Sequence, residues 1–148
     1  MADEVDISFS IEFLPDELGI ELKNQVCTMG LSLNHYWVYN KVDLSLGNNS
    51  LIQTSTSMMS KVDGGAINPV VDANDVVKFL YIKNRDTEDI YLSLDGSVNA
   101  FTSTDSIVIR ADQSWFGMIN GADYDDINAY VTSDNMMMTY AAIIQKVA

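Results

Sequence analysis

The chain has 148 residues, of which 47% are hydrophobic, and its 21 acidic and 8 basic residues give a net charge of −13. This length suits one domain with its own core, and the hydrophobic content excludes a mainly disordered chain. Scattered basic residues argue against a nucleic-acid partner, because phosphate binding depends on clustered Lys and Arg. No apolar run reaches the roughly 20 residues of a membrane helix, and the first residues lack a signal pattern, so we expect neither a membrane partner nor export.

Near the start of the chain, apolar and polar residues alternate without a break. The apolar positions of this run are Val5, Ile7, Phe9, Ile11 and Phe13. A period of two predicts a strand with one buried face and one solvent-exposed face. Pro15 and Gly19 then mark a turn. Alternation resumes over 20–33, with a bulge or break expected near Gly30, where the parity of the apolar positions changes.

The next part of the chain predicts further short strands. An aromatic cluster at 36–39 precedes an alternating strand at 42–46, and 47–49 (Gly-Asn-Asn) is expected to be a turn. The Ser- and Thr-rich segment 51–60 predicts a solvated or edge strand. Residues 61–74 form the longest loop-like segment.

The stretch 76–95 (VVKFLYIKNRDTEDIYLSLD) holds two apolar-alternating runs with a polar connection. Aromatic and β-branched residues dominate both runs and favour strands. The connection at 84–88 contains the Asn and Asp residues typical of turns. We therefore predict a hairpin at the centre of a sandwich.

The last third continues the pattern. Short strands are expected at 107–109, 114–119 and 127–131, with a turn at Asn120-Gly121. The last apolar segment is 140–147, and residues 136–144 could form a strand or a short helix, of which we favour the strand. About nine to eleven short strands without a helical period indicate an all-β fold, a single antiparallel β-sandwich of jelly-roll type. We expect residues 1–148 to form this one domain, with residues 1–6 as an extended N-terminal arm.

Few residues suggest chemistry. Cys27 is the single cysteine, and His35 is the single histidine, so a Cys-His catalytic pair is not expected. The acidic cluster at 72–75 begins like a calcium-binding loop but lacks the required Gly and Glu, which favours solvated turn residues. None of the usual catalytic or nucleotide-binding motifs occurs. We predict a protein that is not an enzyme and that has no metal and no cofactor.

Aromatic and methionine residues are the candidate contact residues. We expect Trp37 in the core and Trp115 in the core or at a subunit interface. An alternative is a carbohydrate-stacking platform formed by Trp37, Trp115, Tyr36, Tyr39 and Phe116. Adaptable apolar side chains, if exposed, mark an interaction surface, and if buried they fill gaps in the core. The methionines in question are Met58, Met59, Met136, Met137 and Met138. The arm residues Ala2, Asp3, Glu4, Val5 and Asp6 are also interface candidates, because an extended arm can pair with a neighbouring sheet.

Three segments of the second half carry a family resemblance: 78–84 (KFLYIKN), 90–96 (IYLSLDG) and 115–121 (WFGMING). In this order they resemble small virion structural proteins of tailed bacteriophages. The chain departs from that pattern at 111–113 (Ala-Asp-Gln), where a Pro-Gly-Glu-like turn is more usual. The resemblance brings no catalytic residues.

The resemblance implies a capsid decoration or cement protein, located on the capsid surface of the virion and made in the host cytoplasm. Its implied partners are the major capsid protein and copies of itself, as a homo-oligomer taken to be a trimer. A neck or tail component and a glycan- or receptor-binding module are the alternatives. A glycan-cleaving enzyme is a third class, which needs two facing carboxylates in a cleft.

Overall fold

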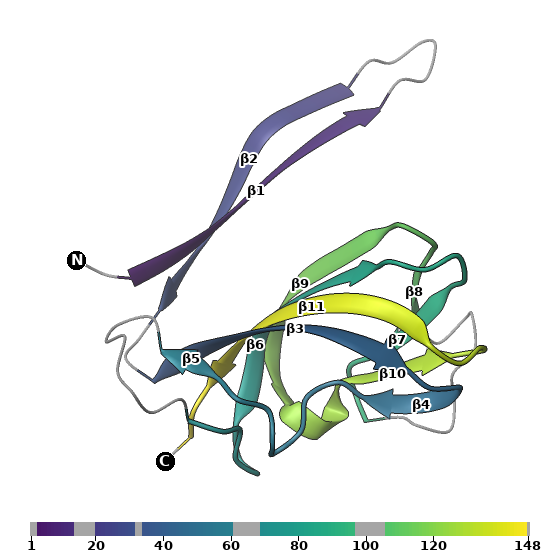
Figure 1. Ribbon diagram of the computed structural model, residues 1–148. Coiled ribbons are helices and arrows are strands. Elements are labelled where there is room, and N and C mark those ends of the chain that lie inside the picture. Colours follow the sequence, from purple (N-terminus) through teal and green to yellow (C-terminus); the bar gives the residue numbers. More distant parts are fainter. Residues whose placement is uncertain (1–2, 14–19, 32–33, 61–68, 97–105, 148) are drawn as a thin grey trace. The chain divides into compact units, whose positions relative to one another are not determined.

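The computed structural model describes residues 3–13, 20–31, 34–60, 69–96 and 106–147 (Figure 1). The chain divides into two compact units, Met1–Leu33 and Asn34–Ala148. That residues 1–148 form one domain stays a prediction. No helix in the described part of the chain is long and apolar enough to span a membrane.

The first unit contains two antiparallel strands, β1 (Asp3–Phe13) and β2 (Ile20–Leu31). Their alternating sequences predicted both strands. The register steps from Phe9 opposite Gln25 to Ile11 opposite Leu22, so the irregularity lies within β2 at residues 23–24. The bulge expected near Gly30 is therefore misplaced, because Gly30 pairs regularly with Glu4.

The second unit contains two sheets. In the order β5-β3-β11-β6-β9, the five-stranded sheet consists of β5 (Met59–Ser60), β3 (His35–Leu44), β11 (Met136–Gln145), β6 (Val76–Asn84) and β9 (Ser114–Asp123). In the order β4-β10-β7-β8, the four-stranded sheet consists of β4 (Gly47–Ser50), β10 (Asn128–Val131), β7 (Ile90–Ser93) and β8 (Ile107–Ile109). A single 3-10 turn, η1 (Tyr124–Asp126), connects β9 to β10 in the described part.

The pairing of these strands is nested. β3 pairs with β11, β4 with β10, β6 with β9 and β7 with β8, all antiparallel. The first of these strands pairs with the last, and each inner pair of strands follows the same rule. One long hairpin that folds over into two sheets has this pairing. This is the strand order of a jelly roll. The predicted all-β, antiparallel jelly-roll sandwich is confirmed.

The core lies between the two sheets. Its fully buried side chains come from both, among them Leu80, Ile82, Tyr140 and Ile144 of the five-stranded sheet and Leu92 of the four-stranded sheet. Each apolar side chain buried here contributes about 1.5–3 kcal/mol through removal from water. Packing of these two inner faces holds the sandwich together.

The predicted central hairpin is wrong. β6 pairs with β11 and β9, whereas β7 pairs with β10 and β8, so residues 85–89 cross from one sheet to the other. Asn84 is buried at this crossing, and its Nδ2 donates to the carbonyl oxygens of Glu88 at 2.7 Å and Ile109 at 3.0 Å. Two alternating runs joined by a polar connection have the same sequence pattern in both topologies. The pattern does not show whether the connection turns back within one sheet or crosses to the other sheet.

Three smaller predictions also change. Turns were predicted at 47–49 and at Asn120-Gly121, but residues 47–49 lie in β4 and Asn120-Gly121 lies within β9, so both segments belong to strands. Val77 pairs with Ala122 and Phe79 with Met118, so extra residues of β9 around 119–121 are accommodated as an irregularity in the strand. Within 51–60 only the last two residues form a strand, while 136–145 is the strand that was predicted.

Candidate functional site

The face of the five-stranded sheet that points away from the core is the candidate interaction surface. Even-numbered residues of β11 over 136–144 lie in the core, so the odd-numbered ones lie on the opposite face. The register extends this face across the sheet. Ile143 lies between Trp37 and Phe79, and Phe79 lies opposite Met118.

A second row of apolar residues runs beside the first. Ala141 lies between Tyr39 and Tyr81, and Tyr81 lies opposite Phe116. We call the two rows the outer face, which consists of Trp37, Tyr39, Phe79, Tyr81, Phe116, Met118, Ala141 and Ile143. Four strands contribute to it, and the sequence positions span more than a hundred residues.

The outer face is apolar and open to contact. Phe79 and Ile143 are only 7% and 5% exposed, and neither belongs to the core cluster between the sheets. Around them, Trp37 is 40% and Met118 is 53% exposed, and Tyr39 and Phe116 are exposed as well. An apolar patch of this kind makes the outer face a candidate interaction surface.

Basic residues border the outer face on one side. In the next row of the same face, Thr139 lies between Lys41 and Lys83. Arg85 joins this row, because its Nε donates to Thr139 Oγ1 at 2.8 Å. These three cations are among only 8 basic residues in a chain of net charge −13. We call them the basic row, and they favour a partner that combines apolar and acidic residues.

A pocket of about 550 Å³ lies beside the edge of β3. β5 pairs only with Tyr36 and Trp37, so the rest of this edge has no strand partner among the described residues. The lining is mostly polar and uncharged, and it includes Asn40, Thr56 and Tyr140. In the described part, the buried Tyr140 hydroxyl forms no hydrogen bond of ordinary geometry. Burial raises the pKa of Tyr140, and the nearby side chains of Asn40 and Thr56 oppose this in part.

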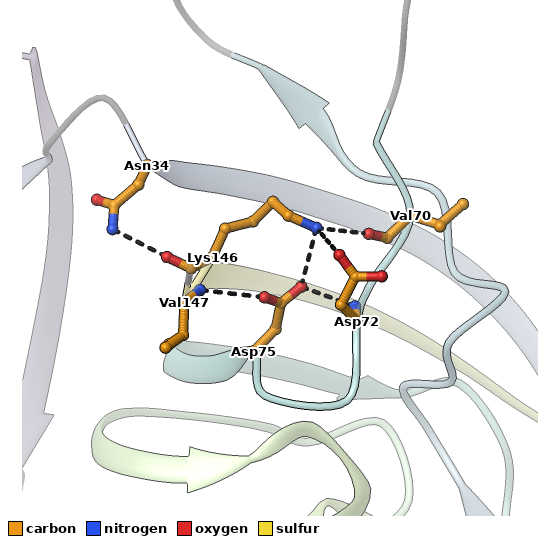
Figure 2. A network of polar contacts seen from close by, with 6 residues as sticks. All are labelled: Asn34, Val70, Asp72, Asp75, Lys146 and Val147. Atoms are coloured by element: carbon orange, nitrogen blue, oxygen red, sulfur yellow. Dashed lines mark hydrogen bonds and ion pairs between the residues drawn. The ribbon is translucent and has the colours of Figure 1, made fainter.

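A buried carboxylate anchors the C-terminal end of β11, as Figure 2 shows. Asp75 is fully buried and accepts hydrogen bonds from the backbone N–H groups of Asp72 at 2.8 Å and Val147 at 3.2 Å. The Lys146 ammonium lies 3.5 Å from Asp75, also pairs with Asp72, and donates to the carbonyl oxygen of Val70 at 3.1 Å. The hydrogen bond with Asp72, opposed in part by burial, raises the pKa of Lys146. This network is structural.

Acidic residues elsewhere also serve turns. Backbone N–H groups of Thr87 and Met137 donate to the Asp86 carboxylate, which lowers the pKa of Asp86. Among the described residues, no three His, Cys, Asp or Glu side chains gather as metal ligands would. The acidic cluster at 72–75 is engaged with Lys146 as Figure 2 shows.

The predicted methionines are separated by the fold. Met58, Met136 and Met138 are core residues, which corrects their prediction as contact residues. For Met136 and Met138 the reason is strand parity, which directs them between the sheets. Met137 is partly buried on the opposite side of β11, and the backbone of Met59 pairs with that of Trp37. Their contact role stays a prediction.

The two tryptophans lie on opposite sides of the sheet. Trp37 was predicted in the core but is exposed on the outer face, because its neighbour Val38 takes the inward position. Trp115 is partly buried and packs against the core, one of its two predicted locations. Asp3, Glu4, Val5 and Asp6 form the start of β1, where they pair with residues 28–31. Ala2 lies outside the described residues.

Sequence reasoning missed several residues of the outer face. Phe79 and Ile143 were assigned to strands but not to a contact surface, and Met118 was not singled out. The sequence pattern could show which residues share one strand face, but it could not show that residues from β3, β11, β6 and β9 form one row across the sheet, because that row depends on sheet register. Register between distant strands is not encoded in local periodicity.

No known family model and no curated protein matches the chain. Two solved structures of the tobacco streak virus coat protein are similar to it. For the coat protein dimer, identity is 15% and the TM-score 0.46, over 80% of this chain and 89% of that chain. For a C2 crystal form of the coat protein, identity is 17% and the TM-score 0.47, over 80% of this chain and 90% of that chain. Similarity at this level assigns neither a family nor a function.

Proposed function

We propose that this protein is a non-enzymatic virion structural protein that decorates or cements a capsid shell. The observation that carries the proposal is the outer face, an apolar surface across four strands with the basic row at its border. Such a surface serves contact with other subunits better than chemistry on a small molecule, because it is broad and has few convergent polar groups.

The resemblance of 78–84, 90–96 and 115–121 to small virion proteins of tailed bacteriophages supports the same proposal. Its partners are the major capsid protein and further copies of itself, on the capsid surface. A decoration protein acts mechanically. Each copy buries area across a joint between shell subunits, and binding to the assembled state stabilises that state by mass action.

The test is co-sedimentation of the purified protein with capsids stripped of accessory proteins. We expect binding in a fixed stoichiometric ratio and a higher temperature of capsid disruption when the protein is bound. The matched variants are Met118→Gln on the outer face and Leu46→Gln, which replaces an exposed apolar residue in the connection between β3 and β4. The first is expected to weaken binding and the second to leave it unchanged. A protein that ignores capsids would refute decoration and favour a neck or tail position.

A glycan-binding role is the second candidate, because Trp37 is exposed, as sugar stacking requires. The neighbour of Trp37 in β11 is Ile143, which offers no polar side chain to sugar hydroxyls. This surrounding favours a protein partner. Quenching of tryptophan fluorescence by oligosaccharides, lost in Trp37→Ser, would reverse the preference.

A further inference from the structure

The pocket beside β3 lies where the neighbouring chain segment leaves the sheet. In the described part of the chain, β5 pairs with only two residues of β3. The residues before β5 lie away from this edge, since Met58 is fully buried in the core and Ser57 forms a bridge with Val70. Residues of β3 and of the segment 49–57 line the space that remains. Its volume of about 550 Å³ lies within the range of small-molecule sites.

A buried hydroxyl without a partner points to a ligand in this pocket. Tyr140 of β11 lies opposite Asn40 in the register, and it lines the pocket although its side chain is fully buried. Within the described residues, its hydroxyl forms no hydrogen bond of ordinary geometry. An unpaired buried hydroxyl destabilises a fold, and a phenylalanine at this position would avoid that cost. A group that enters the pocket and pairs with the hydroxyl explains why a tyrosine is present.

The lining suits a neutral ligand that is rich in hydroxyl groups. Among the described lining residues there is no Lys, Arg or His to bind an anion, and Asp43 is the only carboxylate, whereas a Ca²⁺ ion needs several oxygen ligands. The other polar side chains are amides and hydroxyls. Three of these side chains are exposed and form no hydrogen bond within the described residues, namely Gln53, Ser55 and Ser57. Amides and hydroxyls offer both donors and acceptors, as sugar hydroxyls do.

We propose that this pocket binds a neutral saccharide. One sugar hydroxyl pairs with the buried Tyr140 hydroxyl, and others pair with the amides and hydroxyls of the lining. Tyr39 also lines the pocket and is 56% exposed, so its ring is available to the apolar C–H face of a sugar. Trp37 is not among the lining residues, so this site differs from a stacking platform on that side chain. The inference goes beyond the proposed function and does not depend on it.

A peptide strand added to the edge of β3 fits the observations less well. Such a strand would pair with the backbone of β3 in the plane of the sheet. Tyr140 is a core residue, so its side chain lies on the inner side of that plane, and in-plane pairing would leave its hydroxyl without a partner. Lys41 and Asp43 also lie on this edge strand, and charged residues on edge strands discourage strand addition.

The test is an amide NMR titration of the isotope-labelled full-length protein with maltose, lactose and cellobiose. We expect at least one of these disaccharides to give saturable shifts at residues 38–44 and 53–57, with a Kd of about 1 mM or tighter. No saturable shift with any of them overturns the proposal, because the pocket then holds only water. Shifts centred on Trp37 and Phe79 instead also overturn it and assign sugar binding to the outer face.

Matched variants test the roles of the lining residues. Tyr140→Phe removes only the hydroxyl and is expected to weaken saccharide binding about fivefold or more, whereas Tyr91→Phe removes a hydroxyl from β7 and is expected to leave the affinity unchanged. Gln53→Ala is expected to weaken binding, and the control is Gln113→Ala, which replaces an exposed glutamine outside the pocket. The dispersion of the amide signals verifies that each variant is folded. Equal affinities for Tyr140→Phe and Tyr91→Phe would overturn the proposal.

Two parallel experiments separate this site from other functions. A peptide of alternating Thr and Val is titrated under the same conditions, and peptide binding along 38–44 without disaccharide binding overturns the saccharide site in favour of strand addition. Co-sedimentation with capsids is measured on the same preparation. A protein that binds capsids but no disaccharide refutes the saccharide site alone. A protein that binds a disaccharide in this pocket but ignores capsids refutes decoration alone.

Discussion

Replacing Asp75 with Asn tests whether the buried carboxylate in Figure 2 holds the C-terminal end of β11. Asp75 accepts two backbone N–H groups at 2.8 and 3.2 Å and lies 3.5 Å from the Lys146 ammonium. In Asp75→Asn, one carboxylate oxygen becomes an NH₂ group, which places a donor against a donor and removes the negative charge from Lys146.

The magnitude follows from burial. A hydrogen bond to a buried charged group contributes about 1.5–3 kcal/mol, and breaking a buried ion pair costs about 3–5 kcal/mol. Lys146 is partly exposed and 3.5 Å away, so its share is small. We expect Asp75→Asn to destabilise the sandwich by about 2–4 kcal/mol. The matched control is Asp72→Asn, which removes the other partner of Lys146. Asp72 is 64% exposed, and its replacement is expected to cost less than about 1 kcal/mol.

The assay is urea unfolding followed by tryptophan fluorescence, because Trp37 and Trp115 both report on the second unit. With a slope of about 1–3 kcal/mol per molar urea, the midpoint of Asp75→Asn falls by about 0.7–4 M. Equal midpoints for Asp75→Asn and Asp72→Asn would refute the reasoning, because burial would then make no difference to the carboxylate.

Three further predictions concern the sandwich. A Cβ at Gly117 would lie 2.8 Å from the Trp115 ring, so Gly117→Ala is expected to cost about 1–3 kcal/mol and to shift the fluorescence of the folded protein; urea unfolding and emission spectra measure both. The lowered pKa of Asp86 means that its carboxylate stabilises the folded state above the ordinary value of 3.8, and that this stabilisation is lost as pH falls through the lowered value. Asp86→Asn should therefore flatten the acid unfolding profile. The raised pKa of Tyr140 means that its contribution to the pH dependence of folding stability is fully present below pH 10.0 and is lost as pH rises through the raised value. Tyr140→Phe should remove this alkaline sensitivity and gain up to about 1 kcal/mol at neutral pH, since the buried hydroxyl forms no hydrogen bond within the described residues. An unchanged alkaline profile would contradict it.

Local alternation in the sequence was enough to predict the class of the fold. The run from Val5 to Phe13 and the apolar segment that became β11 are strands because β-branched and aromatic side chains at a period of two suit a half-buried sheet. The many short strands without helical period indicated a sandwich, and the nested strand pairs confirm the jelly roll. From sequence alone, the net charge also argued against a nucleic-acid partner, and the single cysteine argued against a Cys-His catalytic pair.

The tertiary structure decided which residues meet. Alternation fixes which residues share a strand face, but not whether a polar connection turns back, as predicted at 84–88, or crosses to the other sheet, as it does. The same limit placed Trp37 in the core, the reverse of what the structure has, and left open whether Met138 is exposed or buried, which the structure resolves as buried. The outer face unites Trp37, Ile143 and Phe79 only through the register of distant strands. A strand pattern is local, whereas its partners, and therefore its surface, depend on long-range pairing.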